Sequence, residues 1–410
     1  MLHYPPQLKP LFQTLLKHNI IPVIVGGFVR DSLLNIPSKD IDVELYAITS
    51  LSEIVPLLEP FGSLSSVGKS FEVYKLSLDT IEIDFSLPRK DSKVSVGHKG
   101  FVVEVDSSMS FTQASKRRDF TINAMGYNLQ TQQLLDPYGG KEDLTNRVLR
   151  VVDEKTFQED PLRVLRAVQF VARFELHTHP TTLQLLQKMV HNKLLFELPK
   201  ERIYEEFKKL LIKGSKPSLG LLLLKKIGAL NYFKPLRVLS QKEYFSVCDS
   251  LDTLQTLQTP NPKTHLFIAF ALLCRFFNTQ ECKNFLTLLS DEKKLHKEVC
   301  RYLSVEFDLS HITPYALYKL AQHISIQDYL LFLQAQGVCT QTQRAKIKRW
   351  SLKLGIYTQA KKPLVSGKDL LQAGLKPSKE FSHILQKLYE KQIKGEFHTT
   401  QEGIDSLMLF

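Results

Sequence analysis

The sequence VIVGGFVRD at residues 23–31, followed by KDIDVE at residues 39–44, decides the fold of this chain. A short apolar run that ends in two glycines predicts a strand that turns tightly into a helix, and KDIDVE predicts a second strand. Gly26 and Gly27 let backbone N–H groups approach a polyphosphate, beside the positive end of the helix dipole. Arg30, one turn into the helix, can reach the same anion. The segment therefore predicts a phosphate-binding turn.

Two aspartates on the second predicted strand point to a metal site. Asp40 and Asp42 alternate with Ile41, so both side chains project from one face of the strand. Carboxylate oxygens are the ligands that hard cations such as Mg²⁺ take. Two ions, roughly 3.5 to 4 Å apart, can activate an attacking hydroxyl and neutralise a leaving pyrophosphate. We predict that Asp40 and Asp42 are catalytic ligands of two Mg²⁺ ions, with Asp84 ranked below them as a third carboxylate.

The order of motifs resembles a known family. GGFVRD followed by DID resembles the first motif of the nucleotidyltransferase superfamily that includes DNA polymerase beta, in which those aspartates bind metal. RRDFTINAM at residues 117–125 resembles the second signature of class II tRNA nucleotidyltransferases and bacterial poly(A) polymerases. Three further motifs follow in the family's order: LDPYGGKEDL (135–144), EDPLRVLRA (159–167) and PKERIYEEFKKLL (199–211). Together the five motifs cover roughly the first half of the chain.

The resemblance implies a set of nucleotide-binding residues. They are Gly26, Gly27, Arg30, Arg118, Asp119, Asn123, Glu159, Asp160, Arg163 and Arg166. Among these, the resemblance implies that Asp119 and Asn123 order the site. The family often has another arginine where this chain has Gln169, which leaves open any phosphate or sugar contact there.

Asp160 and Arg163 are the predicted base-reading pair. They are three residues apart, and they offer an acceptor and a donor fork to the edge of cytosine or adenine. The resemblance implies that this pair selects both bases without a template. An alternative is that Glu159 and Asp160 simply start a helix, with Pro161 in its first turn.

Composition bounds the class of protein. A chain of 410 residues with 43% hydrophobic content can form more than one domain. No apolar run is long enough for a membrane span, so no membrane partner is expected. Five cysteines are scattered without paired metal spacing, which is typical of reduced thiols in a cytoplasmic protein.

Charge is distributed unevenly along the chain. Residues 1–160 carry 17 Lys and Arg against 21 Asp and Glu, whereas residues 161–410 carry 37 against 21. An acidic head with a basic body suits a metal-dependent enzyme that holds an RNA backbone. RAKIKRW at residues 344–350 is a candidate RNA contact, since cations flank the only tryptophan, although such a cluster can also be a solvated helix face.

The predicted fold class is α+β. Residues 1–144 are expected to form a polymerase-beta-like head with a mixed sheet and helices, including strands at 71–78 and 81–87 and a mobile polar loop at 88–100. Helical apolar spacing dominates from about 145 onward. We therefore expect a helical neck at 145–212 for base recognition, and a helical body and tail at 213–410 for tRNA binding.

The resemblance implies a specific reaction. Residues 363–377 (PLVSGKDLLQAGLKP) resemble the tail of CCA-adding enzymes, which favours tRNA over mRNA ends. The expected activity is template-independent addition of C, C and then A to the 3′ end of tRNA from CTP and ATP, with no protein partner implied. The alternatives are an enzyme that adds only CC or only A, a poly(A) polymerase, and a non-catalytic RNA-binding relative.

Overall fold

The computed structural model divides the chain into two compact units. The first is Met1–Val238 with Leu288–Ser290, and the second is Leu239–Thr287 with Asp291–Phe410. The structure describes residues 2–67, 73–93, 101–106, 108–376 and 380–407.

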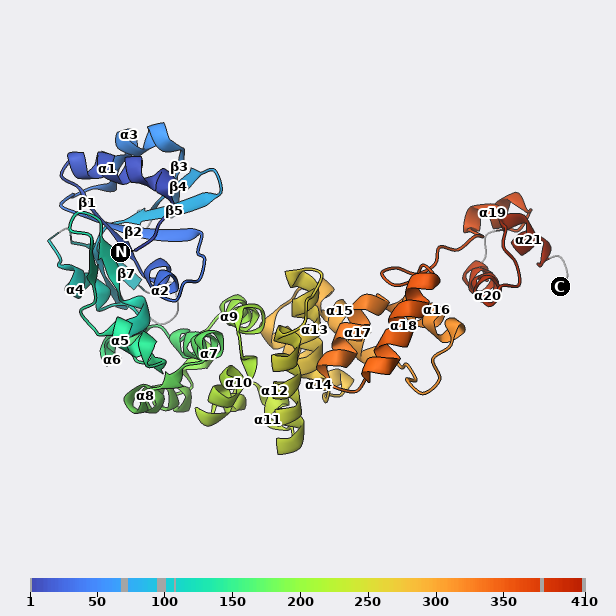
Figure 1. Cartoon of the computed structure of the whole chain (residues 1–410). Helices are drawn as coiled ribbons and strands as arrows, with labels where there is room; N and C mark the ends of the chain where they lie inside the picture. The colour runs from blue at the N-terminus through green and yellow to red at the C-terminus, as the bar shows by residue number, and fades with distance from the viewer. Residues whose placement is uncertain (1, 68–72, 94–100, 107, 377–379, 408–410) are drawn as a thin grey trace. The chain divides into compact units, whose positions relative to one another are not determined.

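A seven-stranded mixed sheet forms the first half of the first unit (Figure 1). Its order is β3-β4-β5-β2-β1-β8-β9. The strands are β1 (Ile21–Val25), β2 (Asp40–Tyr46), β3 (Ser63–Val67), β4 (Val73–Leu78), β5 (Ile81–Ser86), β8 (Gly126–Asn128) and β9 (Gln133–Leu135). In the described part of this sheet, only β2 and β5 pair in parallel, with Asp42 opposite Asp84, and the other pairs are antiparallel.

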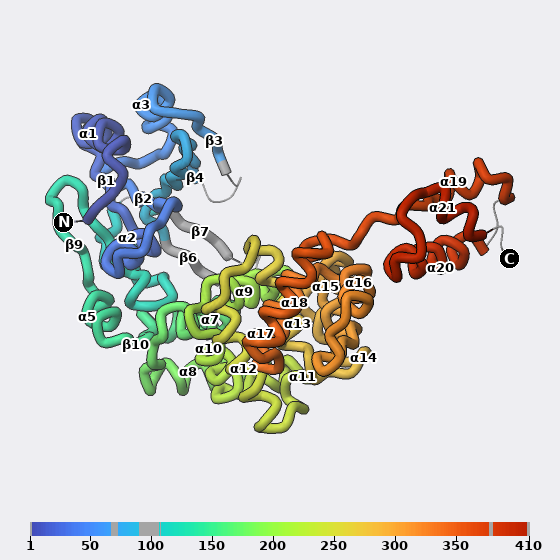
Figure 2. Tube along the Cα trace, turned by 45° about the vertical axis from the view of Figure 1, so that its right-hand side comes forward, coloured from blue at the N-terminus to red at the C-terminus, as the bar shows by residue number. Residues whose placement is uncertain are grey.

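The two faces of the sheet differ because apolar and acidic side chains alternate along β2. Ile41, Val43 and Leu45 are buried in the core, whereas the acidic residues that alternate with them face the other way: Asp40, Asp42 and Glu44. Figure 1 and Figure 2 show α1 (Lys9–Lys17) and α3 (Val55–Leu58) together on one side of the sheet and α2 (Gly27–Leu33) on the other. Short helices α4 (Phe111–Ser115), α5 (Gly140–Thr145) and α6 (Glu154–Glu159) complete the head.

Helices follow the sheet within the same unit. They are α7 (Arg163–Phe174), α8 (Pro180–His191), α9 (Lys200–Lys213), α10 (Pro217–Lys226) and α11 (Lys234–Arg237). Helix α7 packs on both α9 and α10 and buries eight of its twelve residues, so it is the centre of this helical layer. The short strand β10 (Val148–Leu149), before α6, pairs in parallel with β11 (His177–Thr178), which follows α7.

The second unit is helical. Its helices are α12 (Gln241–Gln255), α13 (Pro262–Cys274), α14 (Thr279–Leu289), α15 (Lys293–Ser304), α16 (Pro314–His323), α17 (Ile326–Ala335), α18 (Gln341–Lys353), α19 (Gly367–Gln372), α20 (Phe381–Lys394) and α21 (Thr400–Asp405). Helix α13 is apolar on all sides, and residues 265–274 are all buried among α12, α15 and α17. This helix is therefore the core of the unit.

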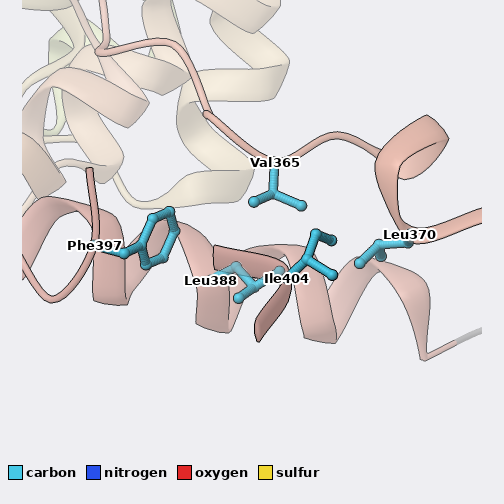
Figure 3. Packing of buried hydrophobic residues seen from close by; sticks show 5 residues of the cluster. All are labelled: Val365, Leu370, Leu388, Phe397 and Ile404. Atoms are coloured by element: carbon cyan, nitrogen blue, oxygen red, sulfur yellow. The ribbon is translucent and has the colours of Figure 1, made fainter. Parts of the chain in front are cut away.

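The last three helices share a small core of their own (Figure 3). Val365, Leu370, Leu388, Phe397 and Ile404 pack together from α19, α20, α21 and their connections. Lys319 of α16 and Glu390 of α20 form an ion pair at 3.0 Å.

The architecture confirms the predicted α+β class, with a mixed-sheet head followed by helices. The predicted loop at 88–100 is wrong in part, because Arg89–Lys93 (β6) pairs with Phe101–Val105 (β7) as a separate two-stranded sheet. Residues 94–100 of that loop, and Phe71 and Glu72 of a predicted strand, lie outside the described residues. None of the described helices has the length and apolar character needed to cross a membrane.

Candidate active site

A cavity of about 460 Å³ lies in the first unit, between the sheet and the helices that follow it. Ten of the residues predicted from the sequence line it: Gly26, Gly27, Arg30, Asp42, Arg118, Asp119, Asn123, Asp160, Arg163 and Arg166. Asp40 and Glu159 do not line it. The fold therefore brings together residues that are up to 140 positions apart in the sequence.

The glycine turn forms one wall of the cavity. Gly26 has φ +70°, a left-handed conformation that favours glycine, and its N–H donates to the carbonyl of Met125 at 3.1 Å. A Cβ at this position would lie 2.8 Å from Nη1 of Arg118. The absence of a side chain thus leaves room for the arginine directly over the turn into α2.

Carboxylates line the neighbouring strands. Asp40 and Asp42 project from the same face of β2, and Asp84 on β5 is the register partner of Asp42. Loss of solvent raises the pKa of Asp42, and the nearby carboxylates of Asp84, Glu44 and Asp40 raise it further against the opposing effect of Arg118. Close carboxylates that resist ionisation together are suited to a divalent cation.

The same carboxylates test the fit of a metal. Oδ1 of Asp84 is buried and accepts no hydrogen bond from any described residue, and Nζ of Lys75 lies 3.7 Å from it. Among the described residues, no three His, Cys, Asp or Glu side chains converge into a ready-made metal cluster. The unpartnered carboxylate oxygen of Asp84, opposite Asp42, therefore fits a divalent cation at this place.

Glu44 continues the acidic face of β2 but has a different role. It is 0% exposed, and its Oε1 accepts hydrogen bonds from Arg118 at 2.9 Å and from Arg117 at 3.3 Å. Burial alone raises its pKa, but the two guanidiniums hold the pKa below its usual value. Glu44 therefore anchors Arg118 in the wall of the cavity. No role for Glu44 was predicted from the sequence, although its alternation with Asp40 and Asp42 places it on the same face.

Arg30 is held by protein groups on several sides. It donates to Asp31 at 2.6 and 2.8 Å and to Asn123, and its guanidinium lies 4.6 Å from the ring centre of Phe174. Burial lowers its pKa, against the effect of Asp31. Asp31 also accepts from Arg173 of α7 at 3.1 Å. Arg30 is thus fixed in one geometry at the cavity wall.

Asp119 joins the head to the helical layer. It is almost fully buried, and its Oδ1 accepts from Asn123 at 2.9 Å while its Oδ2 accepts from Arg166 Nε at 2.7 Å. Despite burial, which raises the pKa, Arg166 and then Asn123 hold the pKa of Asp119 below its usual value. Asp119 and Asn123 therefore lie where they order Arg166 and Arg30.

The predicted base-reading pair lies at the start of α7. Oδ2 of Asp160 accepts from Arg202 of α9 at 3.2 Å. Arg163 donates to the carbonyl oxygens of Thr156 at 2.8 Å and Arg117 at 2.6 Å. These bonds use two of the five guanidinium N–H groups and fix the plane of the fork.

The expectation that Glu159 and Asp160 start a helix is wrong for Glu159, whereas Asp160 lies just before the turn into α7. Glu159 is the last residue of α6, and Asp160 is extended, with φ −114° and ψ 100°. The residue before a proline disfavours the helical region, so Pro161 separates α6 from α7. Asp160 accepts from the N–H of Leu162 at 3.1 Å, as a residue that caps the start of a helix does.

Several residues that line the cavity were not predicted from the sequence. They are Arg117, Leu162, Phe170, Arg173, Arg202, Lys209 and Lys213, together with Gln169, whose role was left open. The spacing of Arg202, Lys209 and Lys213 puts them on one face of α9, which was a usable signal. Nine Lys and Arg line the cavity against three Asp, so its lining favours an anionic ligand.

Comparison with known proteins agrees with this architecture. Residues 23–150 match the family model of the poly A polymerase head domain. Residues 175–237 match a model described as "Probable RNA and SrmB- binding site of polymerase A", and residues 262–408 match a tRNA nucleotidyltransferase domain 2 model. These matches confirm the resemblance to nucleotidyltransferases predicted from the motifs.

Curated relatives match part of the chain. The multifunctional CCA protein of Haemophilus ducreyi is 39% identical over 215 residues, which are 52% of this chain and 50% of that protein. The CCA-adding enzyme of Coxiella burnetii is 39% identical over 213 residues, which are 52% and 54% of the two chains. The chain therefore spans about half the length of the curated relatives it matches.

A solved structure extends the likeness in fold to the whole chain. The Bacillus stearothermophilus CCA-adding enzyme in complex with CTP matches with a TM-score of 0.77 at 24% identity. The match covers 99% of this chain and 98% of that one. At this identity the likeness shows a shared fold.

Proposed function

We propose that this chain, with its poly A polymerase head domain, is a CCA-adding tRNA nucleotidyltransferase. It adds C, C and then A to the 3′ end of tRNA from CTP and ATP and releases pyrophosphate. The observation that carries the proposal is the cavity, where Asp42, the glycine turn, Arg118 and the pair of Asp160 and Arg163 form one cation-rich lining. The names of the curated relatives support the same activity.

Divalent metal dependence is general among nucleotidyltransferases, and we propose two Mg²⁺ ions here. Asp40 and Asp42 would hold them, since the two carboxylates share a face of β2. When bound, such ions lower the pKa of an attacking hydroxyl and neutralise charge on the leaving pyrophosphate. Asp84, opposite Asp42, is the further carboxylate available at this site.

The remaining roles follow from the lining of the cavity. Gly27 and Arg30 bind the triphosphate, and Arg118 and Arg166 hold the nucleotide. These arginines are fixed by carboxylates, which orients donors before the substrate arrives.

Base selection belongs to Asp160 and Arg163. The carboxylate accepts from the exocyclic amine of cytosine or adenine, and Arg163 donates to the ring nitrogen beside it. Because Arg163 is anchored to two carbonyl oxygens, its free N–H groups point in a fixed direction. One rigid pair of this kind serves both CTP and ATP.

The partners of this function are tRNA, CTP and ATP, and the compartment is the cytoplasm. We propose that residues 1–144 carry the chemistry, residues 145–212 read the nucleotide, and residues 213–410 bind tRNA. Five free thiols support a reducing compartment.

The experiment measures incorporation of labelled CTP and ATP with magnesium into tRNA transcripts that end before CCA, after the first C, or after CC. A complete CCA enzyme adds C to the first two transcripts and a single A to the third. Addition of A alone to the third transcript would indicate an A-adding enzyme, and addition of C alone a CC-adding enzyme. A long A tail would indicate a poly(A) polymerase, and tRNA binding without incorporation a non-catalytic relative.

A further inference from the structure

Gln169 is a buried glutamine of α7 that lines the cavity. The residue is 3% exposed, and its Nε2 donates a hydrogen bond to no described residue. Arg166 and Arg173, three residues before it and four after, share its face of the helix and also line the cavity. Gln169 is therefore a buried donor held in the cavity wall between two arginines.

Another buried glutamine of the chain shows how such an amide is satisfied by the protein itself. Gln392 is 2% exposed, its Nε2 donates to the carbonyl of Lys362 at 2.9 Å, and its Oε1 accepts from the N–H of Leu364 at 2.8 Å. A buried donor without an acceptor costs free energy, so native proteins rarely keep one. The amide of Gln169 thus points to an acceptor that belongs to a molecule bound in the cavity.

The surrounding charges identify the kind of acceptor. Three arginines near Gln169 share two carboxylates: Arg166 with Asp119 at 2.6 Å, and Arg30 and Arg173 with Asp31 at 2.6 and 3.1 Å. Glu206, which also acts on Arg166, pairs with Lys209 at 2.8 Å, so the four cations of this cluster exceed its three carboxylates by one. An anionic oxygen satisfies both the unused N–H donor and the excess charge.

Position along α7 separates the phosphate end of the cavity from the base end. Arg163, at the first residue of α7, belongs to the base-reading pair. Gln169 lies six residues further on, about 9 Å along the helix axis. Its neighbour Phe170 packs against Arg30, whose guanidinium lies 5.3 Å from the ring centre. Gln169 is therefore on the part of α7 that faces the triphosphate-binding arginine.

We propose that Nε2 of Gln169 donates a hydrogen bond to a phosphate oxygen of the bound nucleoside triphosphate, an inference that rests on the proposed function. The amide supplies a donor without adding a further positive charge beside Arg166 and Arg173. Because the phosphates are common to both substrates, the contact serves CTP and ATP equally.

The test compares Gln169→Met with Gln169→Glu in the full-length protein. Calorimetric titration with CTP, in magnesium and without tRNA, measures binding in the absence of transfer. We expect the Kd for CTP to rise about tenfold in Gln169→Met, and further in Gln169→Glu, where a carboxylate meets the phosphate. The Kd for inorganic tripolyphosphate is expected to rise by the same factor as the Kd for CTP.

Thermal unfolding of the ligand-free protein distinguishes a ligand contact from a structural one. Removal of an unpartnered amide leaves the Tm of Gln169→Met at or above the wild-type value, whereas Gln392→Met loses two hydrogen bonds and lowers the Tm without changing the Kd for CTP.

Two results would overturn the inference. One is a wild-type Kd for CTP in Gln169→Met, and the other is loss of CTP affinity with tripolyphosphate affinity unchanged, which would place the contact at the base or sugar. If the wild-type protein itself neither binds CTP nor extends tRNA, the proposed function fails first, so the two failures are distinguishable.

Discussion

The cavity of the first unit and the surface of α18 in the second are both rich in cations, but they hold them differently. In the cavity, Arg118 pairs with Glu44 and Arg166 pairs with Asp119. On α18, Arg344, Lys346, Lys348 and Arg349 form no ion pair with any described residue. Lys346 instead lies 4.6 Å from the ring centre of Trp350.

This difference separates two uses of positive charge. Arginines fixed by buried carboxylates present donors in one geometry, which suits recognition of a single small anion. Cations on an open helix face stay free to follow an RNA backbone, and their attraction depends on salt. A groove of about 460 Å³ beside Arg344 and Lys348, also lined by Tyr357, lies within the second unit and suits such a contact.

The largest expected effect is loss of nucleotide transfer in Asp42→Ala, with tRNA binding retained. Asp42→Ala removes a proposed metal ligand, so we expect transfer of CTP to tRNA to fall by more than about 10³-fold. Binding of tRNA, measured by filter retention, stays near the wild-type value because the cations of α18 are untouched. Equal loss of transfer and binding would contradict this division between the two regions.

Breaking a buried pair tests whether the cavity cations are structural. In Asp119→Asn, the buried guanidinium of Arg166 loses its carboxylate, and we expect a loss of about 3 kcal/mol in the free energy of unfolding at pH 7. Arg349→Met on α18 is the control and should change stability little.

The stabilisation by Asp119 is expected to depend on pH. The pKa of Asp119 is lower in the folded protein than in the unfolded chain, where it is about 3.9. Its stabilisation is therefore complete above about pH 3.9 and is lost as the pH falls toward the folded value. Urea unfolding should thus show that the difference in the free energy of unfolding between wild type and Asp119→Asn becomes smaller below about pH 4. If that difference in the free energy of unfolding did not depend on pH, the ion pair of Asp119 and Arg166 would not be its cause.

Base selection is expected to depend on one carboxylate of the cavity. Asp160→Ala removes the acceptor for the exocyclic amine, so we expect the ratio of kcat/KM for CTP to that for UTP to fall by about 10- to 100-fold. Arg202→Met removes the ion pair of Asp160 but leaves the Asp160 carboxylate in place, so most of the preference for CTP over UTP should remain. An unchanged ratio in Asp160→Ala would place base reading elsewhere.

The smallest effect concerns α18. In the double variant Arg344→Met and Lys348→Met, tRNA affinity should weaken by a few fold near physiological salt, and the slope of log affinity against log salt should decrease by about 2. The Kd for CTP should not change. An unchanged salt slope would remove this face of α18 from the RNA-binding surface.

The head was predictable where the sequence pattern is local. Alternation along β2 and β5 and the glycine turn depend on a few adjacent residues, so both could be read directly. The hairpin strand β6 was missed because Arg89–Lys93 contains four charged residues and no apolar alternation. The helix break at Asp160 was missed because an acidic pair before proline also fits a helix start.

The site was predictable only on its motif-bearing side. Arg173, Lys209 and Lys213 line the cavity because α7 packs on α9, and no short motif encodes that packing. Gln169 illustrates the same limit. The sequence shows glutamine where the resembled family often has arginine, but only the fold shows that the amide is buried beside the cavity with no partner among the described residues.

The ion pairs of Asp31 with Arg173, and of Asp119 with Arg166, join residues of the sheet-bearing head to a helix that follows it. For protein engineering, the head and α7 are therefore a single transferable part, although a motif-based boundary falls between them. A chimera cut near residue 144 would separate each carboxylate from its matched arginine. A cut near Val238, where the first unit ends, would transfer the whole cavity to a new C-terminal body.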